Sequence, residues 1–274
     1  MRTKVMAVSA ALTILFVAGV ASAASVDGAT IHWTSKGTGS RTVMFVHGWT
    51  CDATSWDAQV PVLSQKYRVI TLDLPGHGRS GAPASGKFSM ELFARAVEAV
   101  RVEAKVDRAV LVGHSMGTPV IRQYALMYPQ HVSALVLVDG LVQIRGGGRA
   151  FAPPPMTGEA GLKARETMVR GMFGPSTPPP VQQHILKMML GTSEATAAGA
   201  MNATWDTSQW KNDPVTVPVL GIYADRSGLA NREGMKGLYP SLEYHEIPGT
   251  GHFVMMDKPE EFNALLTMFL AKVK

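Results

Sequence analysis

The stretch AVLVGHSMG, residues 109–117, decides the fold of this 274-residue chain. Its first four residues are apolar, which is typical of a buried strand. The next five read Gly-x-Ser-x-Gly around Ser115, and the apolar residues Val120, Ile121 and Tyr124 then recur at helical spacing. The stretch therefore predicts a strand, a sharp turn and a helix, in that order.

The predicted turn at Ser115 has the features of an activated serine. Gly113 and Gly117 are needed because a Cβ on either side of so tight a turn would collide with neighbouring backbone. The serine is placed at the N-terminus of a helix, whose dipole favours negative charge that develops nearby. We interpret Ser115 as a nucleophile; the alternative is an ordinary turn serine.

Other short apolar runs predict further strands. They are apolar throughout rather than alternating, as expected of parallel strands that are covered on both faces. The runs are residues 42–46, 67–72, 134–138 and 217–223, and residues 243–247 are predicted as a further short strand. Segments with helical spacing lie between them, so we predict an α/β fold: a three-layer, mostly parallel sheet flanked by helices. In the last helix, residues 262–270, Asp257 and Glu260 are predicted to form the N-terminal cap.

Residues 141–212 interrupt this alternation. They contain glycine and proline clusters with six methionines between them. We predict a mainly helical cap inserted into a core of residues 24–140 and 213–274. The alternative is a set of surface loops, which would be unusually long for a compact domain.

The N-terminus is predicted to be a secretory signal peptide, residues 1–23. Arg2 and Lys4 precede an apolar stretch that ends at Ala21-Ser22-Ala23, a pattern that suits signal peptidase. A membrane anchor is the alternative, but the stretch contains Ser9 and Thr13 and is short for a membrane span. We therefore expect an exported protein, periplasmic or secreted, with no stable membrane span after cleavage.

Composition excludes several classes of protein. The formal charge of +5 falls to +3 without Arg2 and Lys4, and no basic stripe with interleaved aromatics is present, so nucleic-acid binding is not expected. Cys51 is the only cysteine, which excludes an internal disulfide and a thiolate metal cluster. No histidine pair has metal-ligand spacing, and we expect neither a metal nor a cofactor.

Four motifs together resemble the α/β-hydrolase family, and the resemblance covers nearly all of the chain after residue 23. Besides the serine turn, His47-Gly48-Trp49 resembles the family's H-G-x turn. Residues 73–80, DLPGHGRS, resemble its D-x-P-G-x-G-x-S loop, and Gly249-Thr250-Gly251-His252 resembles its histidine loop. The likeness is to small capped serine esterases and haloperoxidase-like hydrolases.

The resemblance implies roles for three further residues. His252 would be the general base that takes the proton of Ser115. The main-chain N–H groups of Trp49 and Met116 would form the oxyanion hole. The alternatives are a surface histidine and, for Trp49, a simple packing residue.

The acid of the triad departs from the family pattern. After the strand at residues 217–223, Ser227 occupies the position where the family has an aspartate. Two substitutes remain open: Asp139, at the end of the strand at residues 134–138, and Asp225. We favour Asp139. If Asp139 is not the acid, we expect it to cap the turn into the inserted segment. If Asp225 is not the acid, we expect it to bond to the backbone of its own loop.

These residues predict a serine hydrolase that cleaves carboxylic esters through an acyl-enzyme. The Met-rich insertion favours small to medium apolar substrates, since thioether side chains adapt to varied shapes. A perhydrolase or haloperoxidase-like enzyme, a lactonase and a carbon–carbon bond hydrolase are alternatives on the same triad. A ligand-binding module that has lost turnover is the non-enzymatic alternative. Oligomeric state cannot be predicted.

Overall fold

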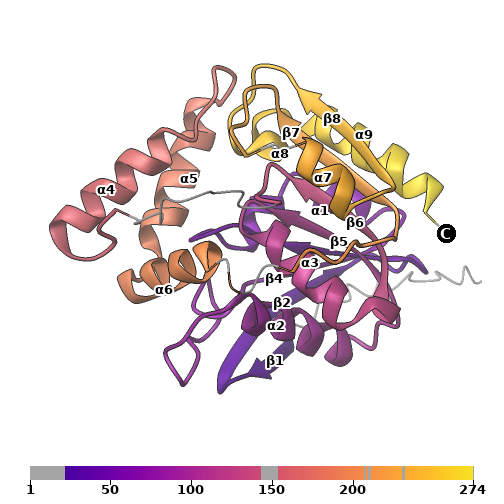
Figure 1. Cartoon of the computed structure of the whole chain (residues 1–274), viewed down its shortest axis with the longest axis horizontal. Helices are drawn as coiled ribbons and strands as arrows, with labels where there is room; N and C mark the ends of the chain where they lie inside the picture. The colour runs from indigo at the N-terminus through magenta and orange to yellow at the C-terminus, as the bar shows by residue number, and fades with distance from the viewer. Residues whose placement is uncertain (1–21, 143–153, 207, 209–210, 230–231, 274) are drawn as a thin grey trace, which may run out of the picture.

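The computed structural model describes residues 22–142, 154–206, 208, 211–229 and 232–273. An eight-stranded sheet runs through it in the order β1-β2-β4-β3-β5-β6-β7-β8 (Figure 1). The strands are β1 Ser22–Val26, β2 Ala29–Lys36, β3 Thr42–Val46, β4 Arg68–Leu72, β5 Ala109–His114, β6 Val132–Val138, β7 Val219–Ala224 and β8 Leu242–Ile247. β3 to β8 are parallel to one another, while β2 is antiparallel to both β1 and β4.

All six strands that the sequence predicted are present. β3, β5 and β7 are buried at every position, as their uninterrupted apolar sequences require. β1 and β2 were not predicted. β2 alternates between buried and more exposed positions near the edge of the sheet, so it lacks an apolar run.

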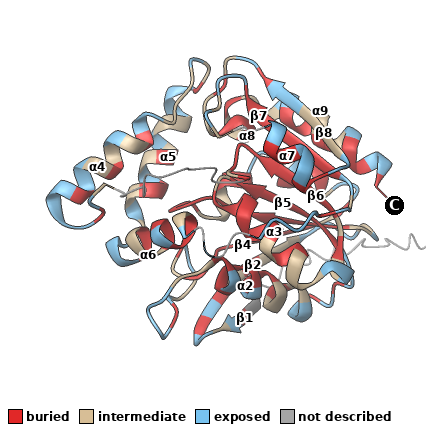
Figure 2. Ribbon diagram, viewed as in Figure 1, coloured by how far each residue is buried: buried red, intermediate tan, exposed pale blue. Residues whose placement is uncertain are grey.

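Helices cover the sheet on both faces, which leaves its central strands buried (Figure 2). The core helices are α1 Val60–Leu63, α2 Met90–Glu103, α3 Gly117–Met127, α7 Arg232–Leu238, α8 Val254–Asp257 and α9 Pro259–Lys272, with 3₁₀ turns η1 Ala53–Trp56 and η2 Pro129–His131. α2 and α3 pack against each other and the sheet, and α8 packs against α9 and η1. The predicted three-layer α/β architecture is confirmed.

The described residues between β6 and β7 form three helices: α4 Gly158–Arg170, α5 Pro179–Gly191 and α6 Glu194–Trp205. They stand beside the sheet rather than on its faces (Figure 1). The mainly helical character of this segment is as predicted, whereas its division from the core as a separate cap stays a prediction. Residues 143–153 of the segment lie outside the described residues.

The predicted signal peptide lies almost entirely outside the described residues. Ser22 and Ala23 are described, and they begin β1, opposite Trp33 and His32 of β2. Within the described part of the chain, no helix is long and apolar enough to cross a membrane. Export stays a prediction.

Candidate active site

The Gly-x-Ser-x-Gly turn has the geometry that its sequence predicts. Ser115 lies between β5 and α3 with φ of 53°, a left-handed conformation that side chains other than glycine rarely adopt. A Cβ on Gly113 would lie 2.4 Å from the carbonyl oxygen of Gly117, and one on Gly117 would lie 2.4 Å from that of Val46. The glycines therefore permit the bend, and the bend leaves Ser115 half-buried between buried neighbours.

His252 meets Ser115 from the loop between β8 and α8. Its Nε2 lies 2.7 Å from Ser115 Oγ, within hydrogen-bond distance. Its Nδ1 lies 2.6 Å from Oδ2 of Asp139. With Nδ1 donating to the carboxylate, Nε2 is left as the acceptor for the serine proton. The two contacts form one chain of hydrogen bonds from carboxylate to imidazole to hydroxyl.

Asp139 completes this chain because of its place at the end of β6. Its N–H donates to the carbonyl of Ile222 on β7, which extends the sheet by one bond, and its φ of 36° then turns the chain away. The carboxylate is buried, and its second oxygen, Oδ1, accepts a hydrogen bond from Ala224 N at 3.0 Å. Both oxygens are thus held, one by backbone and one by His252.

Asp225, the alternative acid, does not reach His252. It is exposed, and its Oδ1 accepts a hydrogen bond from Gly249 N at 3.1 Å. Ser227 accepts a hydrogen bond from Leu229 N at 3.2 Å. The loop after β7 therefore supports the backbone of the histidine loop and supplies no partner to the imidazole.

Two backbone amides are available beside Ser115 at the predicted oxyanion hole. Trp49 and Met116 are both buried, and in the described chain neither main-chain N–H donates to another protein group. Gly48 brings the Trp49 turn close, since a Cβ added there would lie 2.9 Å from Ser115 Cβ. The indole N–H of Trp49 has a hydrogen-bond acceptor within the protein, because Nε1 donates to Ala197 O of α6 at 2.8 Å.

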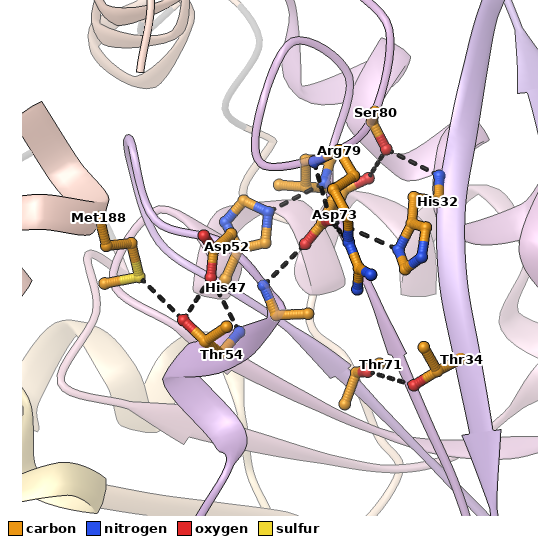
Figure 3. A network of polar contacts seen from close by, with 12 residues as sticks. His32, Thr34, His47, Asp52, Thr54, Thr71, Asp73, Arg79, Ser80 and Met188 are labelled. Atoms are coloured by element: carbon orange, nitrogen blue, oxygen red, sulfur yellow. Dashed lines mark hydrogen bonds and ion pairs between the residues drawn. The ribbon is translucent and has the colours of Figure 1, made fainter. Parts of the chain in front are cut away.

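A network of polar contacts fixes the turn that carries Trp49 (Figure 3). His47 Nδ1 bonds to Gly48 O at 2.8 Å, and its Nε2 accepts from Leu74 N at 2.9 Å. Burial lowers the pKa of His47, which keeps the ring neutral so that one nitrogen donates and the other accepts. Asp73 joins the same region to η1 by accepting from Ala53 N at 2.7 Å. The motifs at residues 47–49 and 73–80 are therefore one structural unit.

The histidine loop is held by the core at both sides of His252. Asp257 Oδ2 accepts from Gly251 N at 2.7 Å, and His114 Nε2 donates to His252 O at 2.9 Å. The predicted capping role of Asp257 is wrong. It is the last residue of α8, and α9 begins at Pro259 without a side-chain cap, because the carboxylate points back to the loop.

His114 is a positioning residue whose role was missed from the sequence. Its ring lies 4.7 Å from that of His252, between centroids, and it is fully buried. Burial, more than any neighbouring charge, lowers its pKa well below the ordinary value, so Nε2 donates as a neutral imidazole. The available signal was its place at the end of β5, immediately before Ser115, where the strand brings both residues to the same edge of the sheet.

The connection between α4 and α5 also binds the histidine loop. His252 N donates to Met172 O at 2.8 Å, and Gly249 O accepts from both N and Oγ of Ser176, at 3.1 and 2.8 Å. The approach is so close that a Cβ on Gly174 would lie 2.1 Å from Gly251 N. The segment between β6 and β7 therefore contacts the main chain of His252, whose imidazole faces Ser115.

A cavity of about 500 Å³ opens on the side of the site formed by Asp139 and His252. Its walls are the connection from Gly171 to Pro175 and the loop from Arg226 to Leu229, with Met172, Phe173 and Leu229 as apolar members. Arg226 is the exposed cation of this lining. Among the described residues no cluster of three or more metal-ligating side chains occurs.

Comparison with known proteins agrees with this architecture. The family model for the alpha/beta hydrolase fold matches residues 41–175. The chain is 38% identical over 263 residues to the dihydrolipoyllysine-residue acetyltransferase component of the acetoin cleaving system of Cupriavidus necator, covering 90% of this chain and 68% of that protein. It is 27% identical over 265 residues to a 2-hydroxy-6-oxononadienedioate/2-hydroxy-6-oxononatrienedioate hydrolase of Burkholderia vietnamiensis, covering 88% and 91%.

A solved thermophilic esterase from Thermogutta terrifontis has the same fold, with a TM-score of 0.79 at 24% identity, covering 92% of this chain and 98% of that one. Taken with the serine turn and the order of the strands, these findings show that the chain belongs to the α/β-hydrolase fold family.

Proposed function

We propose that this protein is a serine hydrolase that cleaves carboxylic esters, with Ser115 as nucleophile, His252 as general base and Asp139 as the acid of the triad. One observation carries the proposal: the unbroken hydrogen-bonded chain from Asp139 Oδ2 through His252 to Ser115 Oγ, at 2.6 and 2.7 Å. It has the order and the bond lengths that proton transfer from a serine requires.

Acylation would begin when Ser115 Oγ attacks the ester carbonyl carbon and its proton passes to His252 Nε2. The carbonyl oxygen becomes negative, and the amides of Trp49 and Met116 are placed to donate to it. Asp139 would stabilise the imidazolium through Nδ1. The C–O bond then breaks, the alcohol leaves with the proton from Nε2, and the acyl group remains on Ser115.

Deacylation would repeat these steps with water. His252 Nε2 takes a proton from the water as its oxygen attacks the acyl carbon, and the same two amides hold the second oxyanion. The proton then returns to Ser115 Oγ as the acid leaves. No other group is needed to balance the reaction, which is consistent with the expectation of no cofactor.

The substrate proposed is a small to medium ester with an apolar part. Met172, Phe173 and Leu229 supply apolar wall beside the imidazole. A perhydrolase, haloperoxidase-like or lactonase activity would use the same groups, and would appear as peroxide-dependent halogenation or as lactone opening in the same substrate screen.

Carbon–carbon bond hydrolysis is the second candidate, and one relative favours it. The Burkholderia vietnamiensis protein is named for a dienedioate that contains no ester bond. Such a substrate is a dianion, and Arg226 is an exposed cation on the cavity beside His252. The two activities are separated by two assays on the same sample. One measures ester hydrolysis, and the other measures release of an enol when a carbon–carbon bond of a vinylogous diketone is hydrolysed.

The test is covalent labelling together with turnover. The wild-type chain is expected to hydrolyse p-nitrophenyl butyrate and to be labelled by a fluorophosphonate at Ser115, as located by peptide mass spectrometry. Ser115→Ala should abolish the labelling and lower kcat by at least about 10³-fold. Ser241→Ala is a matched control, because Ser241 is exposed on the turn before β8 and its hydroxyl donates to Val217 O, away from Ser115.

Two results would contradict the proposal. Wild-type turnover in Ser115→Ala would remove Ser115 from the mechanism. A folded wild-type chain that binds ester analogues but resists the fluorophosphonate and forms no product would instead support the non-enzymatic ligand-binding module.

A further inference from the structure

A second cavity, of about 350 Å³, lies at the opposite edge of the sheet from Ser115. It is formed where β3, β4 and β5 begin: Thr42 of β3 is paired with Arg68 of β4 and with Ala109 of β5. Ser115 follows the far end of β5. At about 3.3 Å per residue, the length of β5 separates the two sites by roughly 20 Å.

Four cations from three separate segments line this cavity: Arg41, Arg68, Lys105 and Arg108. Asp107 is the only acidic residue among its lining residues. None of the four cations forms an ion pair with a carboxylate of the described chain. The lining therefore carries an excess of positive charge that the described chain does not neutralise by contact.

Three of the cations are held in place by backbone carbonyls. Arg41 Nη1 donates to Leu270 O and Val273 O at the end of α9, at 2.8 and 2.5 Å. Arg68 Nη1 donates to Ala104 O after α2 at 2.9 Å, and Arg108 Nη2 donates to Val132 O at 2.8 Å. Each guanidinium has five N–H donors, so these bonds orient the groups and leave further donors for a ligand.

Lys105 supplies an independent observation. It follows the C-cap of α2 with φ of 54°, and the bonds from Lys105 N to Val102 O and from Val106 N to Arg101 O form the helix-ending motif in which this position is usually glycine. A lysine is strained there, whereas a glycine is not. Residues in strained backbone conformations cluster at active sites and ligand clamps. The exposed ammonium lies at the cavity.

We propose that this cavity, defined by Arg41, Arg68, Lys105 and Arg108, binds a small polyanion with clustered oxygens, of the phosphate or polycarboxylate class. Guanidinium groups match the two oxygens of such a ligand, and the ammonium adds a compact charge. The volume is in the range of small-molecule sites. A free anion and the phosphate of a lipid headgroup present the same chemistry to these groups.

The test measures binding of inorganic pyrophosphate to the full chain by isothermal titration calorimetry, with sodium chloride at matched ionic strength as the reference. We expect saturable binding near one site per chain. Lys105→Gln combined with Arg108→Gln should weaken it at least tenfold. Lys187→Gln removes one positive charge from the exposed face of α5 and should leave the affinity unchanged.

Lys105→Gly distinguishes a binding role from a structural one. It relieves the backbone strain, so the Tm of the free protein should rise, while pyrophosphate affinity falls. Binding of phosphatidylglycerol vesicles, but not phosphatidylcholine vesicles, that also requires Lys105 and Arg108 would identify a lipid headgroup as the source of the anion. A circular dichroism spectrum unchanged from that of the wild type shows that these variants are folded.

Two results would overturn the proposal: no saturable heat from pyrophosphate together with no selective vesicle binding, or equal affinity in the wild-type chain and in the variant that lacks both Lys105 and Arg108. Because the cavity lies at the edge away from Ser115, neither result depends on whether the chain hydrolyses esters.

Discussion

Two neighbouring parallel strands, β6 and β7, are each followed by an aspartate, and the two aspartates have different partners. Asp139 follows Val138 directly and Asp225 follows Ala224 directly. Asp139, at φ of 36°, turns its carboxylate to His252 Nδ1, whereas Asp225 keeps an ordinary φ and bonds to the main chain of Gly249. One supports the imidazole and the other supports its loop. Backbone conformation at the strand end, not residue type, makes the difference.

Asp139→Asn is the strongest test of this comparison. The amide no longer stabilises the imidazolium and favours the wrong imidazole tautomer, so kcat for p-nitrophenyl butyrate should fall by about 10⁴-fold, as in Ser-His-Asp enzymes generally. Steady-state kinetics with a circular dichroism spectrum measures both rate and fold. A rate near that of the wild type, with the loss appearing in Asp225→Asn instead, would reverse the assignment of the acid.

Gly174→Ala tests the contact of the inserted segment with the histidine loop. The added Cβ meets Gly251 N at 2.1 Å, which backbone cannot absorb without moving His252. A displacement of about 1 Å costs on the order of 10²-fold in rate. The loss is expected in kcat rather than KM. Gly191→Ala, at the end of α5, is the matched control, because its Cβ would meet no heavy atom of the described chain within 4 Å; equal losses in both variants would disprove the role of this contact.

Asp257→Ala and Asp225→Ala make the same chemical change at a buried and at an exposed partner of the loop. Removing buried Asp257 leaves Gly251 N–H without its acceptor, which costs about 1–3 kcal/mol in stability and is expected to lower kcat about tenfold. Chemical denaturation and kinetics measure the two effects. An unchanged stability would show that Gly251 finds another acceptor.

Asp225→Ala should have the smallest effect. Water can replace the exposed carboxylate at Gly249 N, so we expect a change within about 0.5 kcal/mol in stability and at most about twofold in kcat. The same assays apply. A loss as large as that of Asp257→Ala would mean that burial does not separate the two aspartates.

Much of the core and of the site could be predicted from local sequence. Ser115 was identifiable because glycine spacing, an apolar strand and a helical pattern agree over nine residues, and the strands buried on both faces were visible as apolar runs. β2 was not, because its pattern alternates. Asp139 could only be favoured over Asp225, since the choice depends on one φ angle that no residue pattern specifies.

The supports of His252 were beyond sequence reasoning for a different reason. Asp257 was assigned to a helix cap because three-residue spacing to Glu260 is a local signal, while its actual partner is the backbone of Gly251. The bond from His252 N to Met172 O joins segments that are far apart in the chain. Such contacts arise from the packing of elements, and no periodicity predicts them.

The main-chain bonds between the connection after α4 and the loop of His252 limit how this molecule can admit a substrate. A rigid outward swing of α4 and α5 would break the hydrogen bonds that Met172 O and Ser176 form with this loop. His252 would then lose part of the backbone support that holds its imidazole beside Ser115. Under the proposed function, an ester admitted by that motion would be cleaved only after these hydrogen bonds had formed again.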